Sequence, residues 1–546
     1  MQAAALAPEP APRRPAPLPR ADELPATIAF LLYFAYIDGH YDPAEDAFIA
    51  RLAARDPATH RRVLERVTAD LRELHDEAPR DAGYRAFVHA RLQVRCLEIF
   101  RALGADQQRR LIAILDAFVQ ADGRAAPEEL RLRDDLVQLL TLAPPAHVHA
   151  PARGRPMHLG TARENPPKAA DHPFLQMLEH AFSPHPVELE SQLENDYRLI
   201  ARALMTWHAQ RAAGDGRLSG VRRLADLPPG SAFLDGHTYA LRPDPKRPLD
   251  LIVVGDLHGC YSCLKAVLLQ SDFFRRVYDH QRDPLAHPDV KLVFLGDYID
   301  RGRFSFDGVL RTALQLFVAM PDYVCILRGN HEHFQRGAAG VASVVWPAEA
   351  IATLAPHAPA EMLEAYRVLF EGMPSALVCD RTLYVHGGIP RDDTLAERWR
   401  DLSSLNDPDI RFQMMWSDPA AAEHVPVELQ RQNPRFSFGR QQFRAFMERV
   451  GCQTLVRGHE KVDGGFQATY DLGDLLLLTL FSAGGAENAD LPAESSYRRV
   501  QPMALSVRYE AGSEVGIPWP IAWGPWSSPV HNGFLRELPE LAFRIA

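Results

Sequence analysis

Four short apolar runs from residue 250 onward have the length and composition of buried strands. They are LIVVG, VKLVFLG, YVCILRG and TLYV, and they lead directly to Asp256, Asp297, Asn330 and His386. An open α/β sheet presents its functional loops at the carboxyl ends of its strands. The pattern therefore predicts a sheet with these polar side chains gathered where the strands end.

Residues 24–142 have the pattern of helices instead. The longest early apolar run, IAFLLYFAYI (28–37), is too short to cross a bilayer, which needs about 20 residues, and it predicts a buried helix. The segments 36–53 and 120–137 share the pattern DGxxxPxE, in which a helix runs into a turn and proline begins the next helix. Two such helix-turn-helix units predict an all-α helical bundle.

Six residues at or after the predicted strand ends have side chains that suit divalent or trivalent metals. Such metals take carboxylate oxygen, amide oxygen and imidazole nitrogen, and a pair about 3.5–4 Å apart needs one shared carboxylate plus separate ligands for each. Glycine precedes several of them, as expected where a turn needs positive φ or where backbone passes close to a metal. The candidate ligands are Asp256, His258, Asp297, Asn330, His386 and His459.

These residues belong to motifs in a fixed order: GDLHG, GDYIDRG, GNHE, HGG, NPRFSFG and RGHE. The order resembles the phosphoprotein phosphatase family of serine/threonine phosphatases, within the calcineurin-like metallophosphoesterases, over residues 250–485. The resemblance implies an α/β fold, a calcineurin-like β-sandwich flanked by helices. It also implies a first metal on Asp256 and His258, a bridging carboxylate at Asp297, and a second metal on Asn330, His386 and His459.

The same resemblance implies the catalytic residues. Arg301 and Arg435 match the family's phosphate-clamping arginines, whose planar forks suit bidentate oxyanion contact, although a surface salt bridge is the alternative for each. His331 resembles the histidine that protonates the leaving alkoxide, with Asp300 as the carboxylate that orients it. MMWSDP (414–419) matches a stretch that mainly shapes the substrate surface. The family's SAPNY-type segment is missing, so we expect no aromatic side chain beside the metals.

The repeated turns of the helical region resemble the tellurite-resistance B-like (TerB-like) helical domain. Asp and Glu at helix starts are expected as caps without any ligand, and the turns lack the alternating oxygens of an EF-hand loop. We therefore expect helix caps, with a metal or partner site as the alternative, at Asp38, Asp42, Glu45, Asp122 and Glu129.

Composition divides the chain into segments. Residues 1–23 are rich in Ala and Pro, lack the apolar core of a signal peptide and predict a disordered lead-in. We expect the TerB-like domain over 24–142, a Pro- and His-rich linker over 143–172 and the catalytic domain over 173–546. Near the start of the last domain, SAFLDGHTYALRPD (231–244) predicts a hairpin that leads into the sheet.

Charge and cysteine content exclude several classes. The 546 residues carry 60 Lys and Arg against 70 Asp and Glu, a net charge of −10, and no long basic block, which argues against nucleic-acid binding. The six cysteines favour free thiols in a reducing cytoplasm over disulfides. Cys260 and Cys263 form a single CxxC spacing, a weak zinc signal. We expect a cytoplasmic protein with neither a membrane nor a nucleic-acid partner.

Together these features predict a metal-dependent phosphomonoesterase in which two metals activate a hydroxide for in-line attack on phosphorus. We expect a serine/threonine protein phosphatase that acts on a phosphoprotein or phosphopeptide. Manganese is the first choice for the metals, with iron and zinc as alternatives. The helical domain is expected to regulate the site or to dock a protein partner. A symmetrical dinucleoside-tetraphosphate hydrolase, and a scaffold protein that acts through the helical domain, are the alternatives.

Overall fold

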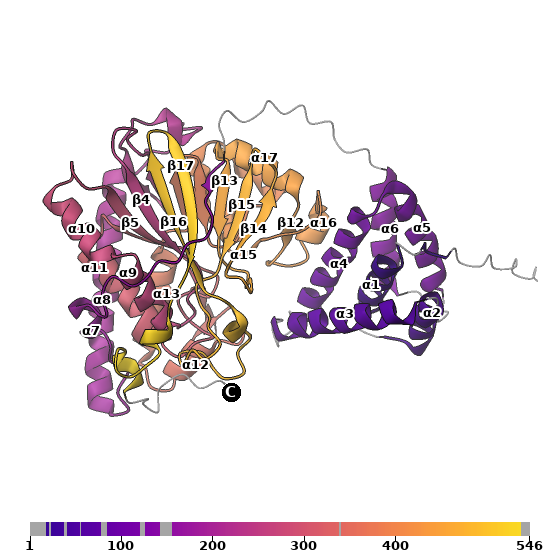
Figure 1. Cartoon of the computed structure of the whole chain (residues 1–546), viewed down its shortest axis with the longest axis horizontal. Coiled ribbons are helices and arrows are strands. Elements are labelled where there is room, and N and C mark those ends of the chain that lie inside the picture. The colour runs from indigo at the N-terminus through magenta and orange to yellow at the C-terminus, as the bar shows by residue number, and fades with distance from the viewer. Residues whose placement is uncertain are drawn as a thin grey trace, which may run out of the picture. The chain divides into compact units, whose positions relative to one another are not determined.

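The computed structural model describes residues 18–20, 23–37, 41–54, 56–77, 84–120, 126–141, 156–337 and 340–536. The chain forms two compact units (Figure 1): Met1–Val148 with Ala421–Glu423, and His149–Ala420 with His424–Ala546. We call the first the helical unit and the second the sheet unit, and describe each by itself.

The described part of the helical unit is helical, as its spacing predicts. Helix α1 (Leu24–Ala35) is buried on almost every side, which confirms the buried helix expected of the apolar run at 28–37. Phe118 meets Phe34 and Phe48 edge-on, and these aromatic rings supply much of the core. The other helices are α2 (Pro43–Ala53), α3 (Pro57–Glu77), α4 (Tyr84–Ala102), α5 (Ala105–Phe118) and α6 (Pro127–Thr141).

Acidic residues at the helix starts make capping contacts. Asp42 accepts the backbone N–H two residues later at 2.7 Å, and Glu45 accepts the N–H of Asp42 at 2.9 Å, which forms a capping box. Glu129 accepts the backbone N–H three residues earlier at 3.0 Å. These are the contacts expected of helix caps. Asp38 and Asp122, the other acids of the two repeats, lie outside the described residues.

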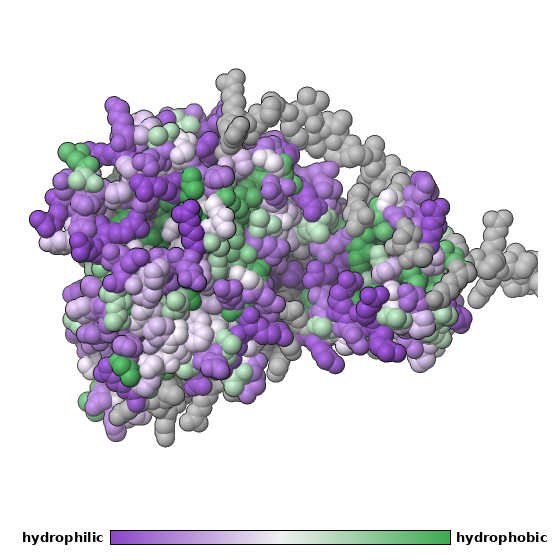
Figure 2. Space-filling model, viewed as in Figure 1, coloured by the Kyte–Doolittle hydropathy of each residue, from purple (hydrophilic) through white to green (hydrophobic). Residues whose placement is uncertain are grey.

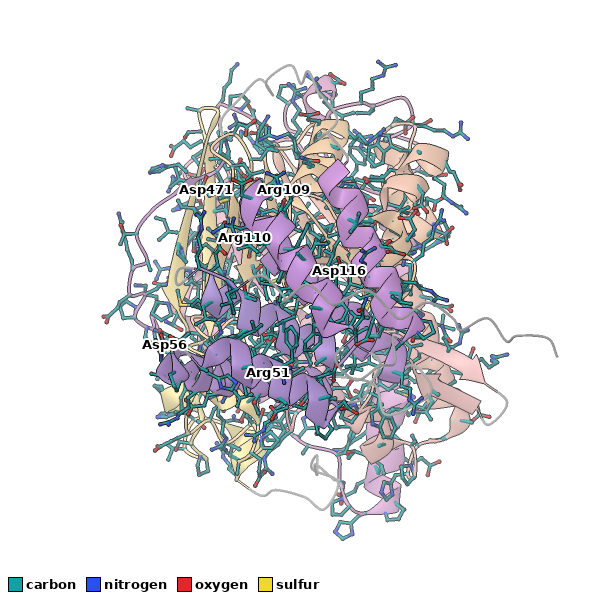
Figure 3. The ribbon with its side chains drawn as sticks, turned by 90° about the vertical axis from the view of Figure 1, so that its right-hand side faces the viewer. Arg51, Asp56, Arg109, Arg110, Asp116 and Asp471 are labelled. Carbon is teal, nitrogen blue, oxygen red and sulfur yellow. The ribbon has the colours of Figure 1, made fainter. Side chains whose placement is uncertain are left out.

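The end of the predicted lead-in packs against the helices. Glu23 is only 4% exposed, accepts the N–H of Arg20 at 3.1 Å and pairs with Arg110. Arg109, Arg110 and Asp116 lie along α5 (Figure 3). Residue 23 therefore belongs to the fold, because a buried carboxylate needs such a partner.

The sheet unit is built on two main sheets (Figure 1). The first has the order β1-β17-β16-β4-β5-β6, in which β4, β5 and β6 run parallel and β16 joins β4 antiparallel. The three parallel strands are buried almost throughout, as expected where a sheet is covered on both faces. Its strands are β1 (His158–Leu159), β17 (Ser513–Pro520), β16 (Met503–Glu510), β4 (Leu249–Val254), β5 (Asp289–Phe294) and β6 (Val324–Ile326).

The second main sheet has the order β14-β15-β13-β10-β9-β3-β2. Side chains alternate along β10: the Tyr384 hydroxyl lies 2.8 Å from that of Tyr509 in the first sheet, whereas Leu383 and Val385 join the core on the other face. The pairing of β2 with β3 confirms the predicted hairpin. The strands are β14 (Phe466–Asp471), β15 (Leu476–Leu480), β13 (Thr454–Arg457), β10 (Thr382–Val385), β9 (Ala376–Cys379), β3 (Thr238–Leu241) and β2 (Ala232–Asp235).

Helices flank this sandwich, and two short strand pairs complete it. The pairs are β7 (Phe334–Gly337) with β8 (Gly340–Ser343) and β11 (Asp418–Pro419) with β12 (Ser437–Phe438). The helices are α7 (Pro173–Gln176), α8 (Pro186–Gly214), α9 (Tyr261–Gln270), α10 (Phe273–Arg282), α11 (Arg311–Ala319), α12 (Glu349–Leu354), α13 (Ala360–Gly372), α14 (Asp392–Arg398), α15 (Pro408–Trp416), α16 (Val427–Gln430) and α17 (Arg440–Val450).

Part of the predicted linker at 143–172 belongs to the first sheet. His158 and Leu159 form β1, which pairs with β17, and Met157 is 3% exposed in the core. The linker therefore ends earlier than its composition suggested. A two-residue strand has almost no pattern of its own, and its partner lies far along the chain.

The exterior agrees with the charge content. Hydrophilic residues predominate on the face seen in Figure 2, with small apolar patches between them. Within the described ranges, no helix combines the length and apolar character needed to cross a membrane. All six cysteines are free and buried, which agrees with the expectation of free thiols.

Candidate metal and active site

The predicted ligands meet where strands of both sheets end. Asp256 follows β4, Asp297 follows β5 and Asn330 follows β6 in the first sheet. His386 follows β10 and His459 follows β13 in the second. The expectation from the apolar runs is therefore met, because parallel neighbours deliver their carboxyl ends to one edge.

The turns that carry these residues have unusual backbone geometry. His258, Asp297 and His459 have φ of 44°, 57° and 70°, in the left-handed region that non-glycine residues rarely adopt. A Cβ on Gly329 would collide with Asp297 Oδ1, and one on Gly458 would collide with Asp256 Oδ1. Strained backbone and close glycines of this kind are typical of functional sites.

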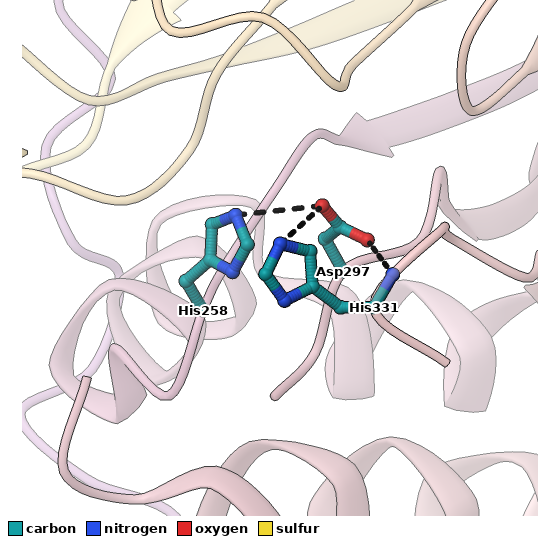
Figure 4. Close-up of side chains that lie close together, drawn as sticks. All are labelled: His258, Asp297 and His331. Carbon is teal, nitrogen blue, oxygen red and sulfur yellow. Dashed lines mark hydrogen bonds and ion pairs between the residues drawn. The ribbon is translucent and has the colours of Figure 1, made fainter. Parts of the chain in front are cut away.

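Asp297 is the centre of the site. Its carboxylate belongs to two groups of possible metal ligands whose ligand atoms lie within 4.8 Å of one another: one with His258 and His331, the other with His386 and His459. Asp297 Oδ2 lies 3.4 Å from His258 Nε2, a contact that is marked by a dashed line in Figure 4, and Oδ1 lies 3.3 Å from His386 Nε2. One carboxylate shared by two imidazole-containing groups is what a pair of metals requires.

Backbone and amide groups orient the imidazoles. His258 Nδ1 lies 2.9 Å from the carbonyl of Ile299, and His386 Nδ1 lies 3.2 Å from that of Leu295, so each carbonyl can accept the ring proton. Each ring then presents Nε2 as an electron-pair donor to the centre. The Asn330 amide oxygen lies 2.9 Å from His386 Nε2 and 2.8 Å from His459 Nδ1.

The electrostatics of the site fit cations. Asp256 and Asp297 are 0% and 2% exposed. Burial first, then the charge of Asp297, raises the pKa of Asp256 to about 7, and burial raises that of Asp297 to about 8. His459 Nε2 is buried and has no hydrogen-bond partner. Two buried carboxylates and a buried ring nitrogen without a hydrogen-bond partner make a costly arrangement that divalent metals would neutralise.

His331 and Asp300 form the predicted pair. His331 Nδ1 lies 2.7 Å from Asp300 Oδ2, and its Nε2 points toward Asp297 at 3.9 Å (Figure 4). The other oxygen of Asp300 accepts the N–H of Ala350 at 2.9 Å. Burial lowers the pKa of His331 well below its usual value, and the cations Arg301 and Arg435 add to the effect.

Both predicted arginines lie close enough to lower the pKa of Asp297, and each is held by an acid. Arg301 Nη1 lies 3.0 Å from Glu349, which the sequence did not suggest, and Arg435 Nε lies 2.8 Å from Asp418. Neither pair is an exposed surface salt bridge, since the arginine side chains are 22% and 16% exposed.

Two further acids at the site were missed. Glu332 is fully buried and accepts the backbone N–H groups of Asp297 and Tyr298 at 2.9 Å and of Gly329 at 3.1 Å. It fixes the turn that carries Asp297, and its place beside His331 in GNHE was the available signal. Asp418 was expected in a stretch that mainly shapes the substrate surface, yet it is 0% exposed and bonds to Arg457 as well as Arg435.

The expected absence of an aromatic beside the metals was wrong. The Tyr497 ring lies 5.3 Å from that of His258 and 5.1 Å from that of Phe481. It comes from a single 3₁₀ turn, Ser496–Arg499, in the long connection between β15 and β16. No aromatic residue follows the strand immediately, and the longer connection brings Tyr497 back to the site further along the chain.

Comparison with known proteins agrees with this geometry. Residues 249–463 match the family described as calcineurin-like phosphoesterase. A probable serine/threonine-protein phosphatase of Encephalitozoon cuniculi is 26% identical over 260 residues, 47% of this chain and 51% of that protein. A serine/threonine-protein phosphatase of Caenorhabditis elegans is 28% identical over 240 residues, 42% of this chain and 46% of that protein.

The chain thus spans about half the length of the curated relatives it matches. Among solved structures, a protein serine/threonine phosphatase from Saccharomyces cerevisiae with similarity to human phosphatase PP5 has a TM-score of 0.37 and 17% identity, over 60% of this chain and 89% of that one. The predicted resemblance to serine/threonine phosphatases is confirmed for the sheet unit, while the TerB-like character of the helical unit stays a prediction.

Proposed function

We propose that this protein is a metal-dependent phosphomonoesterase that removes phosphate from serine or threonine side chains of proteins. The observation that carries the proposal is the buried Asp297 carboxylate, which belongs to both groups of possible metal ligands. A single bridging carboxylate with separate ligands on either side suits two-metal hydrolysis of a phosphate ester. The serine/threonine phosphatases among its relatives support the choice of substrate.

The contacts around Asp297 support the ligand assignment that the family resemblance implies. Asp256 and His258 would hold one metal, and Asn330, His386 and His459 the other, with Asp297 between them. When bound, two such metals supply Lewis-acid polarisation of the phosphoryl group and activate a water molecule at neutral pH. Manganese, with iron or zinc as alternatives, suits this mixture of carboxylate, amide and imidazole ligands.

The chain's own cations bind and orient the phosphoryl group. Glu349 engages Nη1 of Arg301, and among the described residues Nε and Nη2 of that arginine have no hydrogen-bond partner. This edge of the guanidinium suits two oxygens of a phosphate. The Asp418 carboxylate pairs with Nε of Arg435. With both arginines fixed, the phosphorus is positioned for in-line attack.

His331 supplies the proton for the leaving group. Its Nδ1 is committed to Asp300, so Nε2 is the nitrogen that faces the reacting atoms. A proton held on Nε2 passes to the serine or threonine oxygen as its bond to phosphorus breaks. Asp300 keeps the ring in this orientation.

The test is metal analysis of the purified protein, followed by assays on three substrates: a phosphoserine peptide, a phosphotyrosine peptide and a dinucleoside tetraphosphate. We expect two metals per chain, loss of activity on chelation, and the highest kcat/KM on the phosphoserine peptide. Preference for the dinucleoside tetraphosphate would instead support the alternative hydrolase. A fully metal-loaded protein inactive on all three would contradict the proposal and favour a scaffold.

We further propose that the sheet unit carries the activity alone, while the helical unit docks a protein partner or regulates the site. Every proposed ligand belongs to the sheet unit, whose first described residues include Met157 and β1. A fragment that begins at residue 156 should hydrolyse p-nitrophenyl phosphate, whereas one that begins at residue 173 should be less stable because it lacks β1. An inactive but metal-loaded fragment from residue 156 would show that the helical unit contributes to catalysis.

A further inference from the structure

Three arginines, Arg211, Arg328 and Arg411, and one histidine, His237, lie close enough together for the arginine charges to lower the pKa of His237 and of Arg411. They come from the end of α8, the β2–β3 turn, the end of β6 and helix α15. This grouping of basic side chains indicates an anion site in addition to the candidate phosphate site, and it does not include the proposed metal ligands. We call these four residues the cation cluster.

The segment Gly372–Pro374 holds three members of the cluster together. Arg211 donates from Nη2 to the carbonyl of Gly372. His237 Nδ1 lies 2.9 Å from the carbonyl of Met373, and the backbone N–H of Arg328 donates to the carbonyl of Pro374 at 2.7 Å. The fourth member, Arg411, lies in α15 about one helical turn after Asn406. The Asn406 side chain accepts the backbone N–H of His237 at 2.8 Å. The cluster is thus assembled by tertiary contacts and not by a flexible surface loop.

Arg411 has no partner for its charge. Its Nε atom is buried without a hydrogen-bond partner, and no acid among the described residues pairs with its guanidinium. Burial, then the charges of Arg328 and Arg211, lower the pKa of Arg411 to about 9. Burial and the charges of all three arginines of the cluster lower the pKa of His237 to about 3. Arg211, Arg328 and Arg411 therefore repel one another, which is costly in a partly buried place, whereas the His237 ring is uncharged at neutral pH.

The nearest acids do not relieve this repulsion. The negative charges of Glu332 and Glu371 raise the pKa of Arg328. The Glu332 carboxylate, however, accepts backbone N–H groups of the Asp297 turn, and Glu371 pairs with Arg367. A further buried nitrogen lies beside the cluster, since His333 Nδ1 also lacks a hydrogen-bond partner and Arg328 lowers the pKa of that ring.

We propose that the cation cluster binds a small oxyanion, such as inorganic phosphate, sulfate or the phosphate or carboxylate group of a bound peptide. Arginine forks bind such groups through paired charge-assisted hydrogen bonds, and an anion would satisfy the unpartnered Nε of Arg411 and end the mutual repulsion. A water molecule could accept one hydrogen bond but would not neutralise the charge. The proposal does not depend on the phosphatase activity, because no cluster residue is a proposed metal ligand.

The first experiment compares Arg411→Met with the wild-type full-length, metal-loaded protein. Thermal unfolding is followed in sodium sulfate and in sodium chloride at equal ionic strength. The matched control is Arg247→Met, which changes an exposed arginine outside the cluster. The general stabilising effect of sulfate acts on all three proteins, and so does any binding at the catalytic site.

We expect the wild type and Arg247→Met to show a saturable rise in melting temperature with sulfate, and Arg411→Met to need at least about tenfold more sulfate for half of that rise. In chloride alone, Arg411→Met should melt above the wild type, because the uncompensated charge is gone. The same sulfate dependence in all three proteins would overturn the proposal.

A second measurement does not depend on the variant. Crystals of the wild-type protein grown in sodium selenate should show an anomalous selenium peak between Arg328 and Arg411, and no peak there would also overturn the proposal. The source of the anion is then identified by kinetics. A higher KM of Arg411→Met for a phosphopeptide, with p-nitrophenyl phosphate unaffected, identifies a group of the peptide, whereas unchanged KM for both identifies a free ion.

Discussion

Acidic side chains in the helical unit and in the sheet unit have opposite surroundings. In the helical unit, Asp56 accepts hydrogen bonds from the backbone N–H and the hydroxyl of Thr59 at 3.0 and 2.7 Å, and these bonds lower the pKa of its carboxyl. In the sheet unit, burial raises the pKa of both Asp256 and Asp297. The same residue type is satisfied locally in one unit and left short of positive charge in the other.

Sequence distance accounts for the difference. The capping acids bond to backbone groups two or three residues away, so they are satisfied as soon as a helix forms. Asp297 and Asp256 bond to the N–H groups of His331 and His459, which lie 34 and 203 residues away. These carboxylates become buried only when the sheets assemble, and the charges of nearby arginines do not offset the cost of that burial. That contrast separates a helix cap from a candidate metal ligand.

The variant with the largest expected effect is Asp297→Asn, which removes a buried acid of the sheet unit. A neutral amide cannot bridge two cations as a carboxylate does, so we expect loss of nearly all activity and of most bound metal. Elemental analysis and phosphopeptide assays measure both effects. An active variant with two metals per chain would refute the bridging role.

The control for this variant is Asp307→Asn. Asp307 is also buried, and burial raises the pKa of its carboxyl to about 6, but it lies near Arg311 and not at the ligand cluster. This control should keep its metals. If it lost them as Asp297→Asn does, burial of an acid in this unit, and not its position, would determine the result.

His331→Asn tests the proton donor. We expect the metals to be retained and the rate on phosphoserine peptides to fall by about 10²–10⁴-fold. The effect should shrink on p-nitrophenyl phosphate, whose leaving group needs little protonation. Parallel kcat measurements on the two substrates, with His280→Asn as a control outside the site, distinguish the cases. An equal loss on both substrates would count against a general acid.

Glu514→Gln tests a buried acid of the sheet unit that is not a proposed metal ligand and contacts none of them. Burial raises the pKa of its carboxyl to about 7, and Thr382 donates a hydrogen bond to it. The folded state keeps this proton above pH 4.5 and the unfolded state does not, so the stability contributed by the protonated group is lost as pH rises toward 7.

Glutamine avoids that loss. We expect the variant to match the wild type near pH 4 and to exceed it by up to about 3 kcal/mol near pH 8. Chemical unfolding at both pH values checks this, and Glu510→Gln, an exposed neighbour, should show no such difference. A variant less stable than the wild type at pH 8 would mean that the carboxylate is needed in its charged form.

The smallest expected effect is that of Asp42→Ala. Removing one helix cap should destabilise the helical unit by about 1 kcal/mol and leave metal content and activity unchanged. Thermal unfolding and elemental analysis measure the two outcomes. Lost metal in this variant would favour the alternative in which the repeated turns bind a cation.

The local pattern of the sequence determined much of this protein. Apolar runs that end in Asp256, Asp297, Asn330 and His386 marked strands and their functional ends, and the alternating segment at 231–244 marked a hairpin. The six proposed ligands and the His331–Asp300 pair were likewise available from motif order. The strands and the hairpin could be predicted because hydrophobic periodicity and turn chemistry depend on neighbouring residues, whereas the ligand roles rest on the family resemblance and stay a prediction.

Only the tertiary structure decided the remaining features. Three of these features join segments that have no common local pattern. They are the contact of Tyr497 with His258, the pairing of β1 with β17, and the ion pairs of Asp418 with two arginines. The cation cluster likewise combines four separate elements. Burial and repulsion between charges arise when distant segments pack together, and the pattern along the chain does not contain those distances.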